Sequence, residues 1–318
     1  MTDMPGPVSR LRYPLGWRVM DALERGAGIL WPRALHRLTG WLLIAPALLL
    51  VAVLCLGLWR IAQGSLHVLD RATFLPAEAY TLENYRTVLD SATYLKIVWR
   101  SLSGAFLTVV FTLLLAFPYA YMLVRTPSPF VRKALLAVLF LPFFIGQVVR
   151  AYGWLIILGN SGVVNDALGL VGVTPMRLLF SFPTVVFGLV QYMLPFAVLL
   201  LAPALTAIPR ETEIAAGSLG ANWLQVLWHV TLPMARPGLV GAGLVVATLA
   251  LTDFAMPAML GGGSQDFIAN AVYDQFFRTA DQGLGSALAL VLVALGSVLV
   301  GAVFAAFGAG TLAMGGKR

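Results

Sequence analysis

The segment Glu211–Pro237 reads ETEIAAGSLGANWLQVLWHVTLPMARP and forms a polar, helix-forming island in a chain of long apolar runs. Acidic residues stand at its start, where carboxylates favour a helix N-terminus. Gly220 allows a turn, and apolar residues recur after it at helical spacing, beginning with Trp223 and Leu224. Prolines close the segment. The pattern predicts a short helix, a turn and a second helix along a membrane surface.

The rest of the chain has the composition of a membrane protein. Of its 318 residues, 59% are hydrophobic and 11% are charged, whereas a soluble domain carries about 25% charged residues. The net charge of +7 indicates basic cytoplasmic loops rather than nucleic-acid binding, because the sequence has no long Lys/Arg run and no zinc-finger or RNA-binding signature. We therefore expect one polytopic helical bundle of the all-α class.

Six runs are long and apolar enough to cross a membrane, since about 18 or more apolar residues mark a spanning helix. The predicted spans are residues 41–60, 101–124, 134–158, 178–209, 237–260 and 284–312. They make up one transmembrane domain, residues 41–312, and the island is its loop 211–236. Residues 1–40 are a basic segment, in which Trp17–Leu38 is expected to form an interfacial helix.

Loop charges predict the orientation of these spans, because cytoplasmic loops carry an excess of Lys and Arg. The first 40 residues, the loop after the second span and the final Lys317–Arg318 are basic, whereas the intervening loops are acidic or mixed. We therefore expect both termini and the island to lie in the cytoplasm.

The spacing within the island resembles the EAA loop in the permeases of ATP-binding-cassette importers. That loop reads Glu-Ala-Ala, three residues, Gly, nine residues and Ile-x-Leu-Pro. Ala215, Ala216 and Gly220 are in register here, and Val-Thr-Leu-Pro follows at the family spacing. Ile214 occupies the position of the family glutamate, and Glu213 stands one residue early. Because one residue turns a side chain by about 100° on a helix, we expect Glu213 to fill the usual role only in part.

The resemblance extends over residues 80–310. Within the family, the chain is most similar to the polyamine importer permeases. The matching stretches are Gln147–Trp154, Gln191–Phe196, Asp253–Pro257 and Leu260–Gly263. The resemblance implies a permease subunit of a bacterial inner-membrane importer for a small cation such as spermidine or putrescine, delivered by a periplasmic binding protein. It also implies a second homologous permease, two ATP-binding-cassette ATPase subunits and a surrounding lipid bilayer.

In such importers the loop inserts into a groove on an ATPase subunit, and the resemblance therefore assigns coupling residues. They are Glu213, Ala215, Ala216, Gly220, Leu224, Leu232 and Pro233. The stretch Gly310–Lys317 lacks the Gly-Lys-Ser/Thr order of a phosphate-binding loop. ATP and magnesium are therefore expected on the partner ATPase, and we expect no catalytic residue, metal site or cofactor in this chain.

Two charged residues, Arg150 and Asp253, interrupt otherwise apolar spans. An ionised group at the centre of a bilayer costs about 2.5–3.5 kcal/mol on insertion scales. Two interpretations are open. In the first, these residues line or gate the pathway. In the second they are structural: paired with each other, capping broken helices, or placed near the outer interface, where a long side chain reaches water. The other candidates for the pathway or gate are Tyr152, Trp154, Gln191, Tyr192 and Phe254.

More than one class of substrate is compatible with the sequence. A polyamine suits carboxylates and aromatic faces, whereas an arginine in the pathway would suit an amino-acid-like zwitterion or an anion better. A stand-alone secondary transporter is the alternative from another class of protein.

Overall fold

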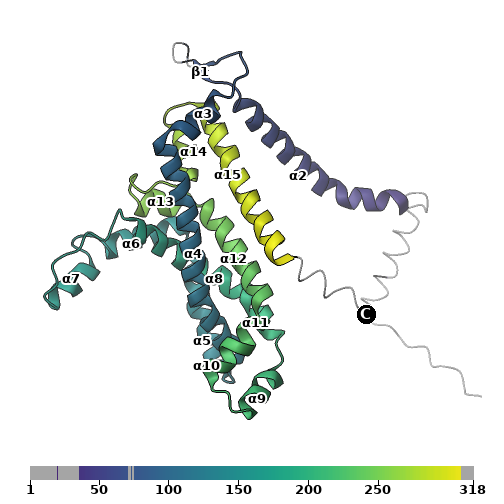
Figure 1. Cartoon of the computed structure of the whole chain (residues 1–318), viewed down its shortest axis with the longest axis vertical. Helices are drawn as coiled ribbons and strands as arrows, with labels where there is room; N and C mark the ends of the chain where they lie inside the picture. Colours follow the sequence, from purple (N-terminus) through teal and green to yellow (C-terminus); the bar gives the residue numbers. More distant parts are fainter. Residues whose placement is uncertain (1–19, 21–35, 71–72, 74, 309–318) are drawn as a thin grey trace, which may run out of the picture. The chain divides into compact units, whose positions relative to one another are not determined.

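The computed structural model describes residues 20, 36–70, 73 and 75–308. This part of the chain is helical apart from one small antiparallel hairpin (Figure 1), in which β1 (Leu69–Asp70) pairs with β2 (Leu75–Pro76). The predicted all-helical class is therefore confirmed. The interfacial helix predicted for Trp17–Leu38 lies largely outside the described residues.

The first half of the described chain contains α2 (His36–Gly64), α3 (Glu83–Asp90), α4 (Ala92–Arg125), α5 (Pro129–Phe140), the 3-10 helix η2 (Leu141–Phe144), α6 (Gln147–Ile157) and α7 (Val163–Leu170). The second half contains α8 (Phe182–Thr206), α9 (Arg210–Ser218), α10 (Trp223–Val226), the π-helix η3 (Leu227–Thr231), α11 (Leu232–Met234), α12 (Arg236–Leu251), α13 (Ala255–Leu260), α14 (Ile268–Phe277), α15 (Gln282–Val303) and η4 (Phe304–Gly308).

Four helices of the described chain are long and apolar enough to cross a membrane: Leu43–Gly64, Ala92–Arg125, Phe182–Thr206 and Gln282–Phe307. Two further candidates are bent pairs of helices. The pair Pro129–Phe144 and Gln147–Ile157 bends by 96°, and the pair Trp223–Met234 and Arg236–Leu251 bends by 71°. The polytopic membrane fold is thus confirmed, with four to six candidate spans where the sequence predicts six.

The differences from the predicted spans have local causes. The span predicted to begin at residue 101 is part of a longer helix that begins at Ala92. The charged residues in its first turns lie outside the apolar run from which the span was predicted. In the predicted span 134–158 the α-helix gives way to η2 beside Pro142, which lacks the N–H that a continuing helix needs, and the chain bends between η2 and α6. The predicted span 237–260 ends as a helix at Leu251 and resumes at Ala255.

The chain divides into two compact units, residues 1–60 and residues 61–318. In the first, the described side chains of α2 are exposed, from Trp41 and Leu43 onward. A helix that is hydrophobic all round and buries none of these side chains suits a span that faces lipid.

The core of the second unit is built where α4, α8 and α12 pack together (Figure 1). Small residues on these helices are fully buried, among them Ala116, Ala197 and Ala242. A Cβ added at Gly238 of α12 would lie 2.3 Å from the Cβ of Ala204 in α8. Small side chains at helix interfaces allow such close approach of backbones in membranes.

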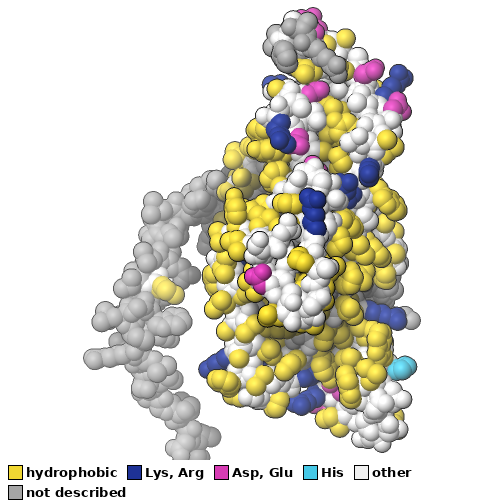
Figure 2. All heavy atoms as spheres, turned by 90° about the vertical axis from the view of Figure 1, so that its left-hand side faces the viewer, with side chains coloured by type: hydrophobic (Ala, Val, Ile, Leu, Met, Phe, Trp, Pro, Cys, Tyr) yellow, Lys and Arg dark blue, Asp and Glu magenta, His cyan; other side chains and the backbone are white. Residues whose placement is uncertain are grey.

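The two ends of the second unit are formed by different helices. Figure 1 shows α9 and α10 at one end of this bundle and α3 and α14 at the other. Hydrophobic side chains cover much of the face shown in Figure 2, and charged side chains gather mostly towards its two ends. This distribution leaves two polar ends for functional sites, separated by the apolar middle.

We predict that Gly238→Ala lowers stability by about 1–3 kcal/mol, because the added methyl overpacks the contact between α8 and α12. Gly241→Ala is the matched control on the same helix, because a Cβ there meets nothing within 4 Å. Thermal unfolding of both variants in detergent measures the difference. Equal stability of the two variants would contradict this account of the core.

Candidate functional site

The loop between α8 and α12 contains the helix and turn that its sequence predicts. The chain leaves α9 through Gly220, whose φ of +90° favours glycine. Asn222 and Gln225 then form a capping box at the start of α10, with two bonds of 2.8 Å between side chain and backbone. The π-helix η3 and the bend before α12 follow. These devices give α9 and α10 a defined geometry.

Apolar side chains of this loop are exposed. Leu219 is 89% exposed and Trp223 is 75% exposed, and Ile214, Leu224 and Trp228 are exposed beside them in sequence. We call these five residues the loop face. A cavity of about 480 Å³ adjoins it, lined by Ala216, Leu219, Gly220, Ala221, Gln225, His229 and Val230. Exposed apolar patches of this kind mark interaction surfaces.

The predicted coupling residues divide between this surface and the interior. Ala215, Gly220 and Leu224 are exposed, whereas Ala216, Leu232 and Pro233 are half-buried. Leu232 packs against the core of the bundle. Glu213 turns away from the loop face, and its carboxylate forms an ion pair of 2.7 Å with Arg125 of α4. Arg125 belongs to the basic loop predicted after the second span, but its pairing with Glu213 was not predicted.

A second group of polar side chains surrounds the break between η2 and α6. Arg150 is 8% exposed, and its Nη2 donates to the backbone carbonyls of Pro142 and, at 3.2 Å, Ile145. Its guanidinium also lies over the ring of Tyr192, with Cζ 5.6 Å from the ring centroid. A helix break in lipid leaves backbone carbonyls without partners. Arg150 therefore supplies the donor that the break requires.

Asp253 occupies the gap between α12 and α13. Its Oδ1 accepts a hydrogen bond of 2.9 Å from the backbone N–H of Met256, and its Oδ2 accepts one from the side-chain amide of Gln147. Arg150 and Asp253 form no salt bridge with each other in the described structure, so pairing is not what holds them in the bundle. Gln147, which the sequence analysis quoted only as part of a motif, connects α6 to this gap.

The aromatic candidates lie in different surroundings. Tyr152 is 58% exposed. Trp154 packs edge-on against Phe187 at 4.6 Å. Phe254 packs against Tyr273 at 4.8 Å. The amide oxygen of Gln191 is buried and has no hydrogen-bond partner among the described residues. The structure therefore does not bring all the candidates to one place. Among the described aromatic candidates, Tyr192 is the one whose ring lies against the guanidinium of Arg150.

A pocket of about 340 Å³ lies beside Phe254, at the α14 end of the bundle. It is lined by Phe254, Ala258, Gly262, Gly263, Asp266, Asn270, Tyr273, Asp274 and Arg278. Burial raises the pKa of the Asp266 carboxyl, and the nearby Asp274 carboxylate raises it further, whereas Arg100 and Arg278 oppose the shift. Two aromatic rings, two carboxylates and the guanidinium of Arg278 thus line one space, and Arg278 forms an ion pair of 3.2 Å with Asp274. Both aspartates belong to the loops that the sequence shows to be acidic or mixed, and neither was a predicted site residue.

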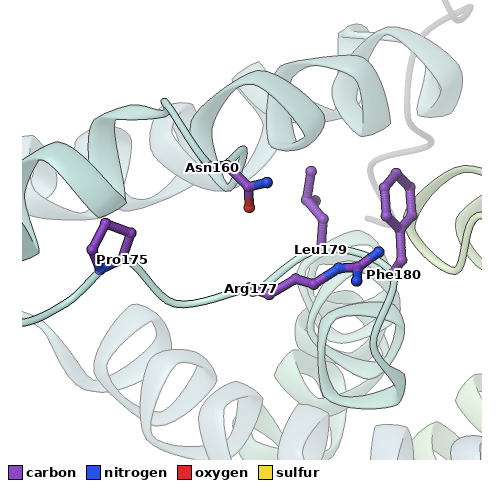
Figure 3. Close-up of a pocket in the computed structure, with 5 residues that line it drawn as sticks. All are labelled: Asn160, Pro175, Arg177, Leu179 and Phe180. Carbon is purple, nitrogen blue, oxygen red and sulfur yellow. The ribbon is translucent and has the colours of Figure 1, made fainter.

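A separate pocket of about 390 Å³ is lined mainly by the segment that leads into α8 (Figure 3). Asn160 and Arg177 bring polar groups to it from two segments, and Leu179 and Phe180 supply apolar walls. Phe180 has a φ of 59°, a strained value for a bulky residue. Its backbone N–H donates to the carbonyl of Leu260 at 3.0 Å, which fixes the start of α8 to the end of α13.

Comparisons with known proteins place these features in one family. A family model described as "Binding-protein-dependent transport system inner membrane component" matches residues 91–311. The spermidine/putrescine transport system permease protein PotB of Escherichia coli (strain K12) is 32% identical over 234 residues, which cover 73% of this chain and 84% of that protein. PotB of Haemophilus influenzae is 33% identical over 222 residues, which cover 69% and 77%.

A solved structure shares the fold. It is a bacterial ABC transporter involved in the import of the acidic polysaccharide alginate, and the match has a TM-score of 0.70 at 20% identity. The match covers 86% of this chain and 96% of the solved chain. Within the part of the present chain that the structure describes, no group of three or more His, Cys, Asp and Glu side chains could hold a metal ion.

We predict that Asp253→Ala destabilises the protein by about 1 kcal/mol more than Asp253→Asn, because the asparagine oxygen still accepts the hydrogen bond from Met256. Thermal unfolding measures this difference. Transport assays of the same variants separate the two interpretations of Asp253. An Asn variant with full stability and full transport assigns the residue a capping role alone, and an Asn variant as unstable as the Ala variant would contradict the capping role.

Proposed function

Because the chain belongs to the family of binding-protein-dependent transport system inner membrane components, we propose that it forms half of the translocation pathway of an ATP-driven importer for a small cation. Membership makes the chain the permease component and not an enzyme, with nucleotide bound by a partner ATPase. The observation that carries the proposal is the family match over residues 91–311, which includes both the loop face and the broken helices.

The loop face is the docking surface for the ATPase in this proposal. Its side chains are large, apolar and exposed, and Gly220 and the capping box hold them on a defined backbone. Burial of one such side chain against a partner contributes about 1.5–3 kcal/mol. The proposed assembly contains two ATPases, a second homologous permease and a periplasmic binding protein.

The orientation follows from charge. The basic residues at the α9 end of the bundle are Arg125, Arg132, Lys133, Arg210 and Arg236. An excess of Lys and Arg favours the cytoplasmic side of the membrane. We infer that α9 and both termini lie in the cytoplasm, where the ATPase has access to the loop face, and that the α14 end faces the binding protein.

A polyamine such as spermidine or putrescine is the proposed substrate. The similarity to PotB supports it. The pocket supports it as well, because Asp266 lies there with the rings of Phe254 and Tyr273, whereas Asp274 is paired with Arg278. Ammonium groups bind carboxylates and aromatic faces. Arg150 belongs to a different part of the bundle, where its Nη2 donates to backbone carbonyls and its guanidinium lies over the Tyr192 ring, and it does not line this pocket.

We predict that Leu219→Ser weakens docking of the ATPase by about 1.5–3 kcal/mol, or roughly 10- to 100-fold in affinity. Leu170→Ser is the matched control, because Leu170 is 90% exposed on α7, outside the loop face. Affinity of the purified chain with its second permease for the ATPase is the measurement. If the wild-type chain binds no ATPase and transport survives ATP depletion, the importer proposal fails and a secondary transporter is favoured.

For the substrate, we predict that spermidine or putrescine, with the binding protein, stimulates ATP hydrolysis by the assembled complex. Asp266→Asn should lower this stimulation by about tenfold, because a carboxylate that faces an ammonium group is lost. Asp166→Asn on α7 is the control, since this exposed carboxylate lies outside the pocket. Stimulation by an amino acid or an anion instead of polyamines would contradict the cationic substrate.

A further inference from the structure

The carboxylate of Glu213 lies where four segments of the second unit meet. Its Oε1 accepts hydrogen bonds from Nη2 of Arg125 at 2.7 Å and from Nε at 3.1 Å. The hydroxyl of Tyr121 donates to Oε2 at 3.1 Å, and the hydroxyl of Thr231 donates to Oε1 at 3.4 Å. Nη2 of Arg125 also donates to the carbonyl of Ile208 at 2.9 Å. We call Glu213, Arg125, Tyr121 and Thr231 the latch.

The latch joins elements that are distant in sequence. Tyr121 and Arg125 stand one turn apart near the end of α4, Ile208 follows α8, Glu213 lies on α9, and Thr231 ends η3. Eighty-eight residues separate Arg125 from Glu213. The contact therefore fixes one element to another and does not merely reinforce a single helix.

Water is largely excluded from the pair. The side chains of Arg125 and Glu213 are 14% and 11% exposed, and Thr231 is fully buried. Charge-assisted hydrogen bonds are roughly twice as strong as neutral ones, and a carboxylate that an arginine contacts through two nitrogens has its orientation defined. The helix α9 contains no fully buried residue. The latch is therefore its main polar attachment to the bundle within the described chain.

The offset of the acid by one residue gives it this inward direction. A helix turns by about 100° per residue, and Ile214, the next residue, is 61% exposed on the loop face. The helix thus presents an apolar side chain outward at the position of the family glutamate and a carboxylate inward one residue earlier. Docking and anchoring are divided between two neighbouring residues.

We propose that Glu213 is a positioning residue that makes α9 and the end of α4 move as one unit, so that displacement of the loop face by the ATPase reaches the membrane helices. This role rests on the proposed function. Glu213 need not contact the ATPase for this role, since its carboxylate is already engaged within the chain.

A continuous set of contacts leads from the latch into the bundle. α4 packs against α8 and α12. Tyr192 of α8 lies beneath Arg150, which binds the carbonyls at the break between η2 and α6. Spatial continuity alone does not demonstrate energetic coupling. The test must therefore measure the affinity for the ATPase separately from the amount of substrate transported per ATP.

The experiment uses the full complex in lipid nanodiscs for ATPase binding and hydrolysis, and proteoliposomes for substrate transported per ATP hydrolysed. In Glu213→Gln, we expect ATPase affinity within about twofold of wild type and a loss of about tenfold in transport per ATP, a typical size for coupling between sites. Glu213→Asp should restore part of the loss. Glu211→Gln, an exposed acid on the same helix, should behave as wild type.

Two further variants keep the test decisive if Glu213→Gln folds poorly. Tyr121→Phe removes one hydroxyl and keeps the ion pair, and should cause a smaller loss of transport per ATP. The double variant Arg125→Gln with Glu213→Gln should be no worse than either single variant, because the two residues act through one contact.

Three results would overturn the positioning role. Unchanged transport per ATP in both Glu213→Gln and Tyr121→Phe would show that the latch transmits nothing. A loss of ATPase affinity that matches the loss of transport would show that Glu213 acts at the docking surface itself. Losses that add in the double variant would show that the two residues act separately. A wild-type complex without bound ATPase would instead refute the proposed function, and this role with it.

Discussion

In lipid, every backbone N–H and C=O must find its hydrogen-bond partner inside the protein, and the polar architecture of this chain follows from that demand. The helices are interrupted before α6 and again after α12, and a side chain binds the exposed backbone at each of these interruptions. Arg150 donates to the carbonyls of Pro142 and Ile145 before α6, and Asp253 accepts a hydrogen bond from the N–H of Met256 after α12. Asn270 adds a third case, since its amide donates to the carbonyl of Phe254 and accepts from the N–H of Phe267. The charged residues in the apolar segments thus have structural partners before any substrate is considered.

The same breaks create the functional geometry. In a straight helix the backbone groups are all paired and leave no opening. The chain between α12 and α13 is not helical, and it places Phe254 beside Tyr273 in the wall of the pocket that Asp266 and Asp274 also line. At the opposite end, the bend before α12 and the π-helix η3 bring Thr231 to Glu213. Both ends are held by the packed helices α4, α8 and α12, so the proposed docking face and the proposed cation pocket belong to one scaffold.

Much of this fold could be predicted from the sequence, because apolar runs of about 20 residues have few alternatives to a spanning helix. Helix breaks are harder to predict, because a proline in an apolar run does not by itself show whether the helix breaks there. Pro142 lies in η2, next to a break, whereas Pro195 lies inside the uninterrupted helix α8. Partners distant in sequence could not be found at all. Arg125 is an ordinary loop charge in the sequence, and Glu213 is a coupling candidate without a predicted partner, until the fold places them 2.7 Å apart. The offset of Glu213 from the family position was visible, and the structure supplies its reason in the inward direction of the carboxylate.

The central claim is that an ATPase drives this chain from the end that carries α9. Site-specific photo-crosslinking in the assembled complex tests it directly, with a photoreactive phenylalanine analogue at Leu219 or at Phe277, which is 74% exposed on α14. The account predicts that the ATPase is captured from position 219 and not from position 277. Capture from position 277 alone, or from neither position in a complex that hydrolyses ATP, would contradict it.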